Sequence, residues 1–377
     1  MPPAYDVIIA GLGVMGSSVA LHAARRGLRV LGIDRFAPPH TLGSSHGSTR
    51  LIREAYYEHP LYVPLVRRSH ELWRELEHDA GEVLLTRTGS LMVGHPDSEL
   101  VRGTIRSGEE HAVPHEVLDA EELHRNFPGF EPPDDFVGVH EPGSSLLQPE
   151  RVWASQLRLA EAAGAEFITN QAVLSWKSAE GVTNVRTDSG SFEGAQLVLS
   201  AGAWNRSLAP DALAMLSVER QLQQWWAPAR NAELFRAARM PVSMWQLSDG
   251  RIFYTIPDTG QGLKLGWHHN GPTVDPDRVE RDASPAENAE LTDLLRRFMP
   301  AAKGMRQASA VCFYTNTPDG HFLVDPCPGA RGVWLMSPCS GHGFKFASVL
   351  GECMADLLTG RTPAFDLSPF RHDRFAQ

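Results

Sequence analysis

The first 34 residues place a strand, a glycine-rich turn, a helix and a second strand in an order that few folds share. Val7–Ala10 is short and fully apolar, as expected for a buried parallel strand. The turn Gly11-Leu-Gly-Val-Met-Gly16 follows, then a helix that stops at Gly27 and a strand that ends in Asp34. Such glycines allow a tight turn and close approach of the backbone to a pyrophosphate, and the acid accepts ribose hydroxyls. The pattern predicts an α/β dinucleotide-binding domain, and it leaves NAD and FAD equally open.

Composition narrows the class of protein. With 377 residues the chain is long enough for two domains, and a net charge of −10 argues against a nucleic-acid or anionic-membrane partner. We find no basic leader and no apolar run long enough for a membrane span, which needs about 20 residues. The four cysteines all follow residue 311 without metal-ligand spacing. These features predict a reduced, cytoplasmic protein with no metal site.

The nucleotide domain is predicted to be discontinuous. The apolar run Leu197–Ser200, followed by Ala201-Gly-Ala-Trp204, is typical of a strand that returns to the parallel sheet. We therefore assign residues 1–86, 148–216 and 319–377 to the nucleotide domain. Residues 87–147 and 217–318 form a second domain, with a mixed β-sheet that binds substrate.

A polar loop, Gly43-Ser-Ser-His-Gly-Ser-Thr-Arg50, follows the second strand. Arg50 and Arg53 are three residues apart, so they share a face if this stretch is helical. Surface arginines are the ordinary interpretation. The apolar and aromatic neighbours up to Tyr57 instead favour a partly buried anion site.

Two strands of the second domain carry reactive side chains. In Gly262–His268, alternation places Lys264, Gly266 and His268 on one face, so the lysine faces either a cavity or solvent. In Ala310–Tyr314, Cys312 and Tyr314 likewise share a face. A buried cysteine is most often a small hydrophobic residue, and a reactive role is the alternative.

Near the C-terminus, Ser340-Gly-His-Gly-Phe-Lys-Phe346 precedes an apolar helix that ends at Gly360. Gly341 and Gly343 can turn sharply and expose backbone N–H groups at the helix start, where negative charge is favoured. A plain turn before a packing helix is the alternative.

Taken together, these motifs resemble the monomeric sarcosine oxidase and N-methyltryptophan oxidase family of flavoprotein amine oxidases. The resemblance covers essentially the whole chain. Its most specific segments are Ser44–Arg53, Leu263–Gly266, Val311–Tyr314 with Thr317–Asp319, and Ser340–Lys345.

The resemblance implies FAD and a thioether between Cys312 and the flavin 8α-methyl carbon. It implies an oxygen-activating role for Lys264, a substrate carboxylate held by Arg53 and Lys345, and a pocket lined by His268 and Tyr314, with Arg50 against the flavin. Arg50 is thus grouped with Lys264, His268 and Tyr314 as catalytic. The implied cofactor contacts are Gly11, Gly13, Gly16, Asp34, Arg35, Ser44, His46, Thr49, Arg50, Val173, Cys312, Gly341, Gly343, Phe344 and Lys345.

The activity implied is oxidation of a secondary amino acid by a monomer: an N-methyl amino acid becomes an imine that hydrolyses, and O2 becomes H2O2. A cyclic or bulkier amino acid (proline, pipecolate or N-methyltryptophan) is an alternative substrate, and an electron carrier is an alternative acceptor. An NAD(P)-dependent reductase and a non-catalytic flavoprotein subunit are further alternatives. The roles of Cys339 and of Trp225, Trp226 and Trp245 stay open, although core packing is the simplest role for the tryptophans.

Overall fold

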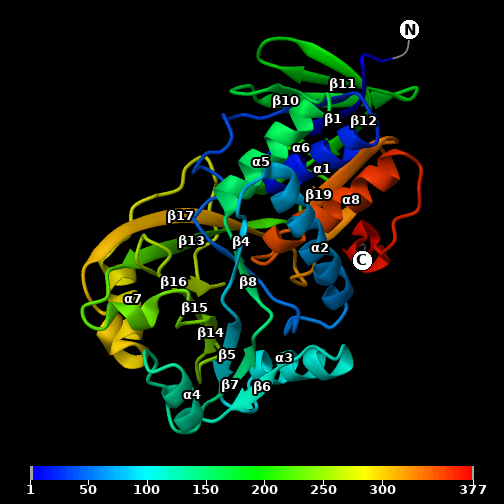
Figure 1. Cartoon of the computed structure of the whole chain (residues 1–377). Helices are drawn as coiled ribbons and strands as arrows, with labels where there is room; N and C mark the ends of the chain where they lie inside the picture. The colour runs from blue at the N-terminus through cyan, green and yellow to red at the C-terminus, as the bar shows by residue number, and fades with distance from the viewer. Residues whose placement is uncertain (1–2, 376–377) are drawn as a thin grey trace.

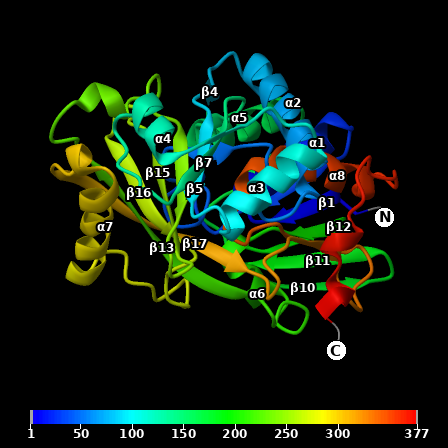
Figure 2. The same ribbon diagram turned by 90° about the horizontal axis from the view of Figure 1, so that it is seen from below.

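The computed structural model describes residues 3–375 and contains two eight-stranded sheets joined by a small third sheet (Figures 1 and 2). The first sheet runs in the order β10-β11-β12-β1-β2-β9, with β19 beside β12 and β18 beside β19. Its strands are β1 (Tyr5–Ala10), β2 (Val30–Ile33), β9 (Glu166–Ile168), β10 (Val173–Ala179), β11 (Val182–Thr187), β12 (Ser191–Leu199), β18 (Leu323–Pro326) and β19 (Val333–Ser337).

The centre of this sheet is parallel, as a dinucleotide-binding fold requires. β1 pairs in parallel with β2 and β12, and β12 pairs in parallel with β19. Val7–Ala10 and the whole of β2 are buried, which explains why both strands are continuous apolar runs. The return of Leu197–Leu199 to this sheet is confirmed by the pairing of β12 with β1.

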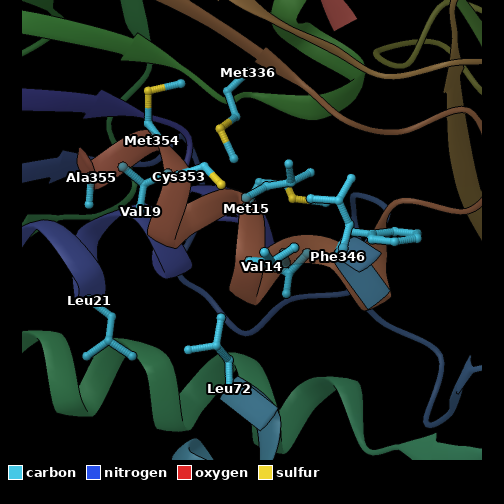
Figure 3. Packing of buried hydrophobic residues seen from close by; sticks show 14 of the residues in the cluster. Val14, Met15, Val19, Leu21, Leu72, Met336, Phe346, Cys353, Met354 and Ala355 are labelled. Atoms are coloured by element: carbon cyan, nitrogen blue, oxygen red, sulfur yellow. The ribbon is translucent and has the colours of Figure 1, made fainter. Parts of the chain in front are cut away.

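Helices cover one side of this sheet. They include α1 (Val14–Arg25), α2 (Tyr62–Ala80), α5 (Pro149–Ala162) and α8 (Ala347–Leu358), and α6 (Asn205–Leu208) follows β12. α1 packs between α8 and α5 through small residues, and a Cβ at Gly351 of α8 would meet Ser18 Oγ at 2.2 Å. Figure 3 shows the apolar side chains of this layer, with Met15 and Val19 of α1 facing Phe346 and Met354.

The second sheet runs in the order β17-β13-β16-β15-β14-β5-β7-β6. Its strands are β5 (Ser90–Gly94), β6 (Glu116–Leu118), β7 (Val137–Glu141), β13 (Ser217–Trp226), β14 (Val242–Gln246), β15 (Ile252–Ile256), β16 (Leu263–His268) and β17 (Arg306–Asn316). It is antiparallel except for the parallel pair β14–β5, which joins the two chain segments that build it. All eight strands fall within 87–147 and 217–318, whereas the exact domain boundaries stay a prediction.

Three helices flank the second sheet: α3 (Glu99–Glu110), α4 (Ala120–Asn126) and α7 (Pro285–Phe298). Capping boxes start α4 at Asp119 and α7 at Ser284. Leu291, Leu294 and Phe298 of α7 belong to the apolar cluster that covers the outer face of the sheet. Its inner face is therefore left for the site.

The third sheet lies between the two large ones (Figure 1). It consists of β3 (Arg50–Ile52), β8 (Ser145–Leu147) and β4 (Leu85–Arg87). Within residues 3–375, no helix combines the length and the apolar character needed to cross a membrane.

Candidate active site

The glycine turn forms one end of a cavity that passes between the two large sheets. Gly11 has φ +97°, and a Cβ there would lie 2.6 Å from Ala201 Cα. A Cβ at Gly16 would lie 1.8 Å from Gly11 O, so this glycine sets the packing of α1 on the turn. Gly16 itself does not line the cavity, in contrast to Gly11 and Gly13. The backbone is therefore exposed where a pyrophosphate would approach.

Asp34 lies at the end of β2, at the cavity wall. Its two carboxylate oxygens accept the backbone N–H groups of Leu12 (2.6 Å) and Phe36 (2.8 Å). Burial raises the pKa of the Asp34 carboxyl, against the opposing effect of these two N–H groups. The next residue, Arg35, also lines the cavity, while its guanidinium pairs with Asp277 at 2.6 Å. Asp34 keeps lone pairs that hydroxyl groups of a ribose could use.

The far end of the cavity is formed by the inner face of the second sheet. Strict alternation puts Gln223 of β13, Lys264 and His268 of β16, and Cys312 and Tyr314 of β17 on this face. The same register adds apolar and aromatic residues from neighbouring strands. These are Val242 and Met244 of β14 and Tyr254 and Ile256 of β15.

Lys264 is buried in this wall, with an exposed fraction of only 2%. Its Nζ donates to Gly47 O at 2.8 Å and to Thr49 O at 3.3 Å, which leaves one hydrogen of an ammonium uncommitted. Burial, followed by the nearby positive charge of Arg50, lowers the Lys264 pKa well below its usual value. Of the two orientations that the sequence left open, the cavity-facing one is correct.

Cys312 is buried and unpaired, and Gln223 Nε2 donates to its sulfur at 2.7 Å. Cys339 lines the same cavity from the loop after β19, and burial raises the pKa of its thiol to about 11. A thiol with so high a pKa is a poor nucleophile near neutrality.

The two arginines after the polar loop lie on a strand and at its end, so the helical alternative is wrong. β3 pairs with β8, and a strand places residues i and i+3 on opposite sides. Arg50 donates from Nη1 to Thr49 O and from Nη2 to Ser44 O, which holds the loop. Its guanidinium lies 5.6 Å from the centre of the Phe344 ring.

Arg53 is almost fully buried at the end of the cavity. Its Nη1 donates to Ala55 O at 2.9 Å and its Nη2 to Glu58 Oε2 at 2.6 Å. The ring of Tyr56 lies 4.2 Å below its Cζ. Burial acts to raise the Glu58 pKa, but Arg53 and two further neighbours outweigh it and the pKa is lowered. The result is a desolvated ion pair facing the cavity.

Lys345 comes from the glycine-rich loop before α8. A Cβ at Gly343 would lie 1.6 Å from Pro338 O, and one at Gly341 would lie 2.8 Å from the Tyr314 ring, so both positions require glycine. The tight loop carries the chain into a short helical turn (Phe344–Phe346) that continues into α8. Burial lowers the Lys345 pKa to about 7, and Arg53 contributes further. An anion beside this group would favour the ammonium form.

His268 and Tyr314 form a pair beside these cations. His268 Nδ1 lies 3.2 Å from the Tyr314 hydroxyl, and both side chains line the cavity. Burial, then the neighbouring His269, lowers the His268 pKa well below its usual value, so the imidazole is neutral. Burial raises the Tyr314 pKa.

Most of the sequence-predicted residues meet at this one cavity. Its wall includes Gly11, Gly13, Asp34, Arg35, Ser44, Thr49, Arg50, Arg53, Val173, Lys264, His268, Cys312, Tyr314, Gly341, Gly343, Phe344 and Lys345. His46 does not line it: its side chain is buried, and burial, then Arg50, lowers its pKa to about 4.

The three tryptophans are likewise outside the cavity wall. Trp226 and Trp245 belong to the apolar cluster beneath α7, as the core-packing interpretation predicts. Trp225 lies opposite Lys264 in the β13–β16 pair, 5.4 Å from its Nζ.

Sequence reasoning missed residues that only the strand register and a loop bring to the cavity. They are Glu58, Gln223, Val242, Met244, Tyr254, Ile256 and His342. The period-two pattern of Val242–Gln246 could have indicated Met244, because it faces the side opposite to Trp245.

The chemistry of the wall fits a long cofactor with polar edges. A glycine turn that exposes backbone lies at one end, and two cationic side chains lie at the other. Between them, in the part of the chain that the structure describes, Thr49 Oγ1 and Gln223 Oε1 are buried without a hydrogen-bond partner. Buried polar atoms of this kind are satisfied by a ligand or water. The residues present therefore fit FAD, which has hydrogen-bonding groups along its length.

Comparison with known proteins agrees with this assignment. Residues 6–357 match the family model described as FAD dependent oxidoreductase. The monomeric sarcosine oxidase of Streptomyces avermitilis is 37% identical over 100% of this chain and 99% of its own length. The N-methyl-L-tryptophan oxidase of Salmonella heidelberg is 36% identical over 99% of this chain and 100% of its own. The structure of NikD, an unusual amino acid oxidase essential for nikkomycin biosynthesis, superposes with a TM-score of 0.85 at 23% identity, covering 97% of each chain.

The fold and the site define an FAD-dependent oxidoreductase. Since the matches span the whole chain, it belongs to the monomeric sarcosine oxidase and N-methyltryptophan oxidase family.

Proposed function

We propose that this enzyme oxidises a secondary amino acid, most simply an N-methyl amino acid such as sarcosine, to an imine that water hydrolyses to an aldehyde and an amine. The observation that carries this proposal is the pair of buried cations, Arg53 and Lys345, at the end of a cavity that also contains Lys264 and Cys312. A substrate carboxylate is the complement of two such cations. The FAD, when bound, accepts the two electrons of this oxidation and transfers them to O2, which yields H2O2.

The cations act by binding and orientation. Arg53 has a planar guanidinium that can meet both oxygens of a carboxylate, and Lys345 adds a point charge. Fixing one end of a small substrate holds its amine and the adjacent C–H bond in a single orientation. The wall of Met244, Tyr254 and Ile256 excludes water from that end.

The neutral imidazole of His268 can accept a hydrogen bond or a proton from the substrate amine. An amine must be unprotonated to be oxidised, and a cationic imidazole beside it would not accept a proton. His268 and the Tyr314 hydroxyl lie within hydrogen-bond reach of each other and line the substrate end. We assign them to orienting the amine. Rates should therefore rise with pH through one ionisation of the bound substrate.

We assign Lys264 to the O2 step and Cys312 to a covalent link with the FAD. Lys264 has one uncommitted hydrogen and a buried position, which are suited to stabilising negative charge as it develops on oxygen. Cys312 lines the cavity from β17, and Gln223 Nε2 donates to its sulfur at 2.7 Å, whereas burial raises the pKa of the other cavity thiol, Cys339, to about 11. We further propose that the enzyme acts as a monomer in the cytoplasm, where its four unpaired cysteines would stay reduced.

The test is anaerobic mixing of the purified yellow enzyme with sarcosine, N-methyl aromatic amino acids, proline and pipecolate. Bleaching by sarcosine or another N-methyl amino acid, followed by O2 uptake and H2O2 release on aeration, is the expected outcome. If proline or pipecolate bleached the enzyme most efficiently, the substrate would be a cyclic amino acid and not an N-methyl amino acid. Bleaching without rapid O2 uptake would show that a carrier accepts the electrons.

A further inference from the structure

A chain of three side chains ends at Lys345, and each hydrogen bond in it has one possible direction. His342 Nε2 lies 3.1 Å from Gly320 O, and since a carbonyl only accepts, the imidazole proton lies on Nε2. Burial lowers the His342 pKa to about 3, so the ring is neutral and its Nδ1 is an acceptor. The Tyr56 hydroxyl, 2.8 Å away, must therefore donate to Nδ1. Its oxygen is then free to accept from Lys345 Nζ at 3.2 Å.

The same geometry fixes the direction of the ammonium. Lys345 Nζ also donates to His342 O at 3.0 Å, so two of its three hydrogens are committed to the protein. The third is left for the cavity that Lys345 lines. The backbone is held from behind as well, because Trp73 Nε1 donates to Lys345 O at 2.9 Å. The flexible side chain of Lys345 is thus fixed, and only one of its Nζ hydrogens can be donated into the cavity.

Tyr56 also supports the second cation. Its ring lies 4.2 Å from Arg53 Cζ, within the range of a cation–π contact. One fully buried side chain therefore touches both groups that the proposed function assigns to the substrate carboxylate. The ring of His342 is in turn fixed by stacking on Phe322, with centroids 4.7 Å apart.

We propose that Tyr56, with its hydroxyl direction set by the His342 tautomer, is a positioning residue that holds Lys345 as a directed donor toward the substrate carboxylate. This inference rests on the proposed function, because it presumes that Lys345 binds a carboxylate. The hydroxyl of Tyr56 and the imidazole of His342 then strengthen substrate binding, although neither group touches the reacting atoms.

The pKa of Lys345, and with it the pH dependence of carboxylate binding, depends on the charges around its ammonium group. The groups that act on its ammonium are Arg53, Arg50, Glu58, the neutral His268 and the Tyr56–His342 pair. The two arginines disfavour the charged form and Glu58 favours it. The Tyr56 oxygen accepts a hydrogen from the ammonium and so favours the charged form too. Removing that acceptor should lower the pKa of Lys345 further and move the loss of carboxylate binding to lower pH.

The experiment uses the holoenzyme and methoxyacetate, an analogue of sarcosine in which an ether oxygen replaces the oxidisable amine. Its Kd is measured between about pH 6 and about pH 9, from the change in flavin absorbance and by calorimetry. Tyr56→Phe keeps the ring beneath Arg53 and removes only the hydroxyl. We expect Kd to rise by roughly tenfold, as for loss of a hydrogen bond to a charged group, and the pH midpoint of binding to fall. His342→Leu, which leaves the Tyr56 hydroxyl without its acceptor, should show the same two changes.

Tyr62→Phe is the matched control. Tyr62 belongs to the same aromatic cluster, 5.0 Å from the Tyr56 ring, and its hydroxyl bonds His321 Nδ1 at 2.9 Å. This second tyrosine–histidine pair does not line the cavity. Its loss should leave both Kd and the pH midpoint unchanged.

A double variant separates the inference from the proposed function. In a Lys345→Met background, Tyr56→Phe should have no further effect on Kd, since both changes remove the same contact. Additive effects, or a Tyr56→Phe enzyme with the Kd and pH midpoint of the unaltered enzyme, would overturn the inference alone. If Lys345→Met itself binds methoxyacetate as well as the unaltered enzyme does, then the carboxylate role of Lys345 fails, and the inference fails with it.

Discussion

Arg53 Nη2 donates to Glu58 Oε2 at 2.6 Å, so the guanidinium that faces the substrate end is already paired with a carboxylate of its own chain. The pair is buried, with side-chain exposed fractions of 2% and 16%. Burial acts to lower the Arg53 pKa, but Glu58 together with Tyr56 and Tyr57 outweighs this effect and the pKa is raised. A substrate carboxylate must therefore compete with Glu58 or share Arg53 with it.

Glu58→Gln removes this competitor and should tighten methoxyacetate binding by roughly three- to tenfold, because an amide neutralises less of the arginine charge. Calorimetry on the holoenzyme measures the effect. Glu54→Gln is the control, since it breaks a half-exposed pair with Arg67 at 2.9 Å outside the cavity wall. Weaker binding in Glu58→Gln would show instead that Glu58 holds Arg53 in its productive orientation.

Cys312→Ser should release the flavin on acid precipitation, because a serine hydroxyl cannot form the thioether. The measurement is the flavin content of the pellet and of the supernatant. Cys339→Ser, at a second thiol of the same cavity, should keep the pellet yellow. If Cys339→Ser released the flavin and Cys312→Ser kept it in the pellet, the flavin would be attached through Cys339.

Lys264→Met should slow reoxidation of the reduced enzyme by O2 about 100-fold or more, the usual cost of losing an electrostatic donor from a buried site. Anaerobic reduction by substrate should change far less. Stopped-flow absorbance separates the two half-reactions. Equal slowing of both would remove the O2 role of Lys264.

Gly11→Ala should abolish FAD retention, because its Cβ would lie 2.6 to 2.8 Å from the backbone of residues 200–201. Gly27→Ala is the matched control. Gly27 also has a positive φ of +83°, but no atom lies within 4 Å of its Cβ. The control should lose about 1 kcal/mol of stability from backbone strain and keep its FAD. Equal FAD loss in both variants would show that strain, and not crowding, is the cause.

Lys345 should make the free energy of unfolding depend on pH. Its pKa in the folded protein is lowered to about 7, whereas in the unfolded chain it is near the ordinary lysine value of 10.5. Between these values the unfolded chain binds more protons, so stability rises with pH by up to about 1.4 kcal/mol per pH unit for this group. Denaturant unfolding between about pH 7 and about pH 9.5 should therefore show a shallower slope in Lys345→Met. An unchanged slope would contradict the lowered pKa.

Features set by local sequence were predictable. The β1–turn–α1–β2 order and Asp34 depend on residues close in the chain, and the structure places them as expected. The helical interpretation of Arg50–Arg53 is wrong because β3 is only three residues long and exists through its pairing with Leu146 and its neighbours, nearly 100 residues later in the sequence. Such pairing leaves no signal within β3 itself.

The substrate end was predictable in part. Lys264 and Cys312 stand in strands with clear alternation, whereas Tyr254 reaches the cavity through the register of β15 with β14. Glu58 is placed by a loop and by its ion pair with Arg53. His46 shows the converse: it lies in a segment close to the site, yet it is buried and does not line the cavity.

The order of strands in the two large sheets has a consequence for biosynthesis. β12 receives β19 (residues 333–337) as its parallel neighbour, and α1 packs on α8 (residues 347–358). The cavity wall beside β13 is completed by β17 (residues 306–316), and Lys345 lies further along the sequence. A nascent chain released at residue 300 would thus contain the whole glycine turn and Asp34, yet lack Cys312, Tyr314 and one substrate cation. Loading of FAD is therefore expected to follow translation, as one of the last events in maturation of the enzyme.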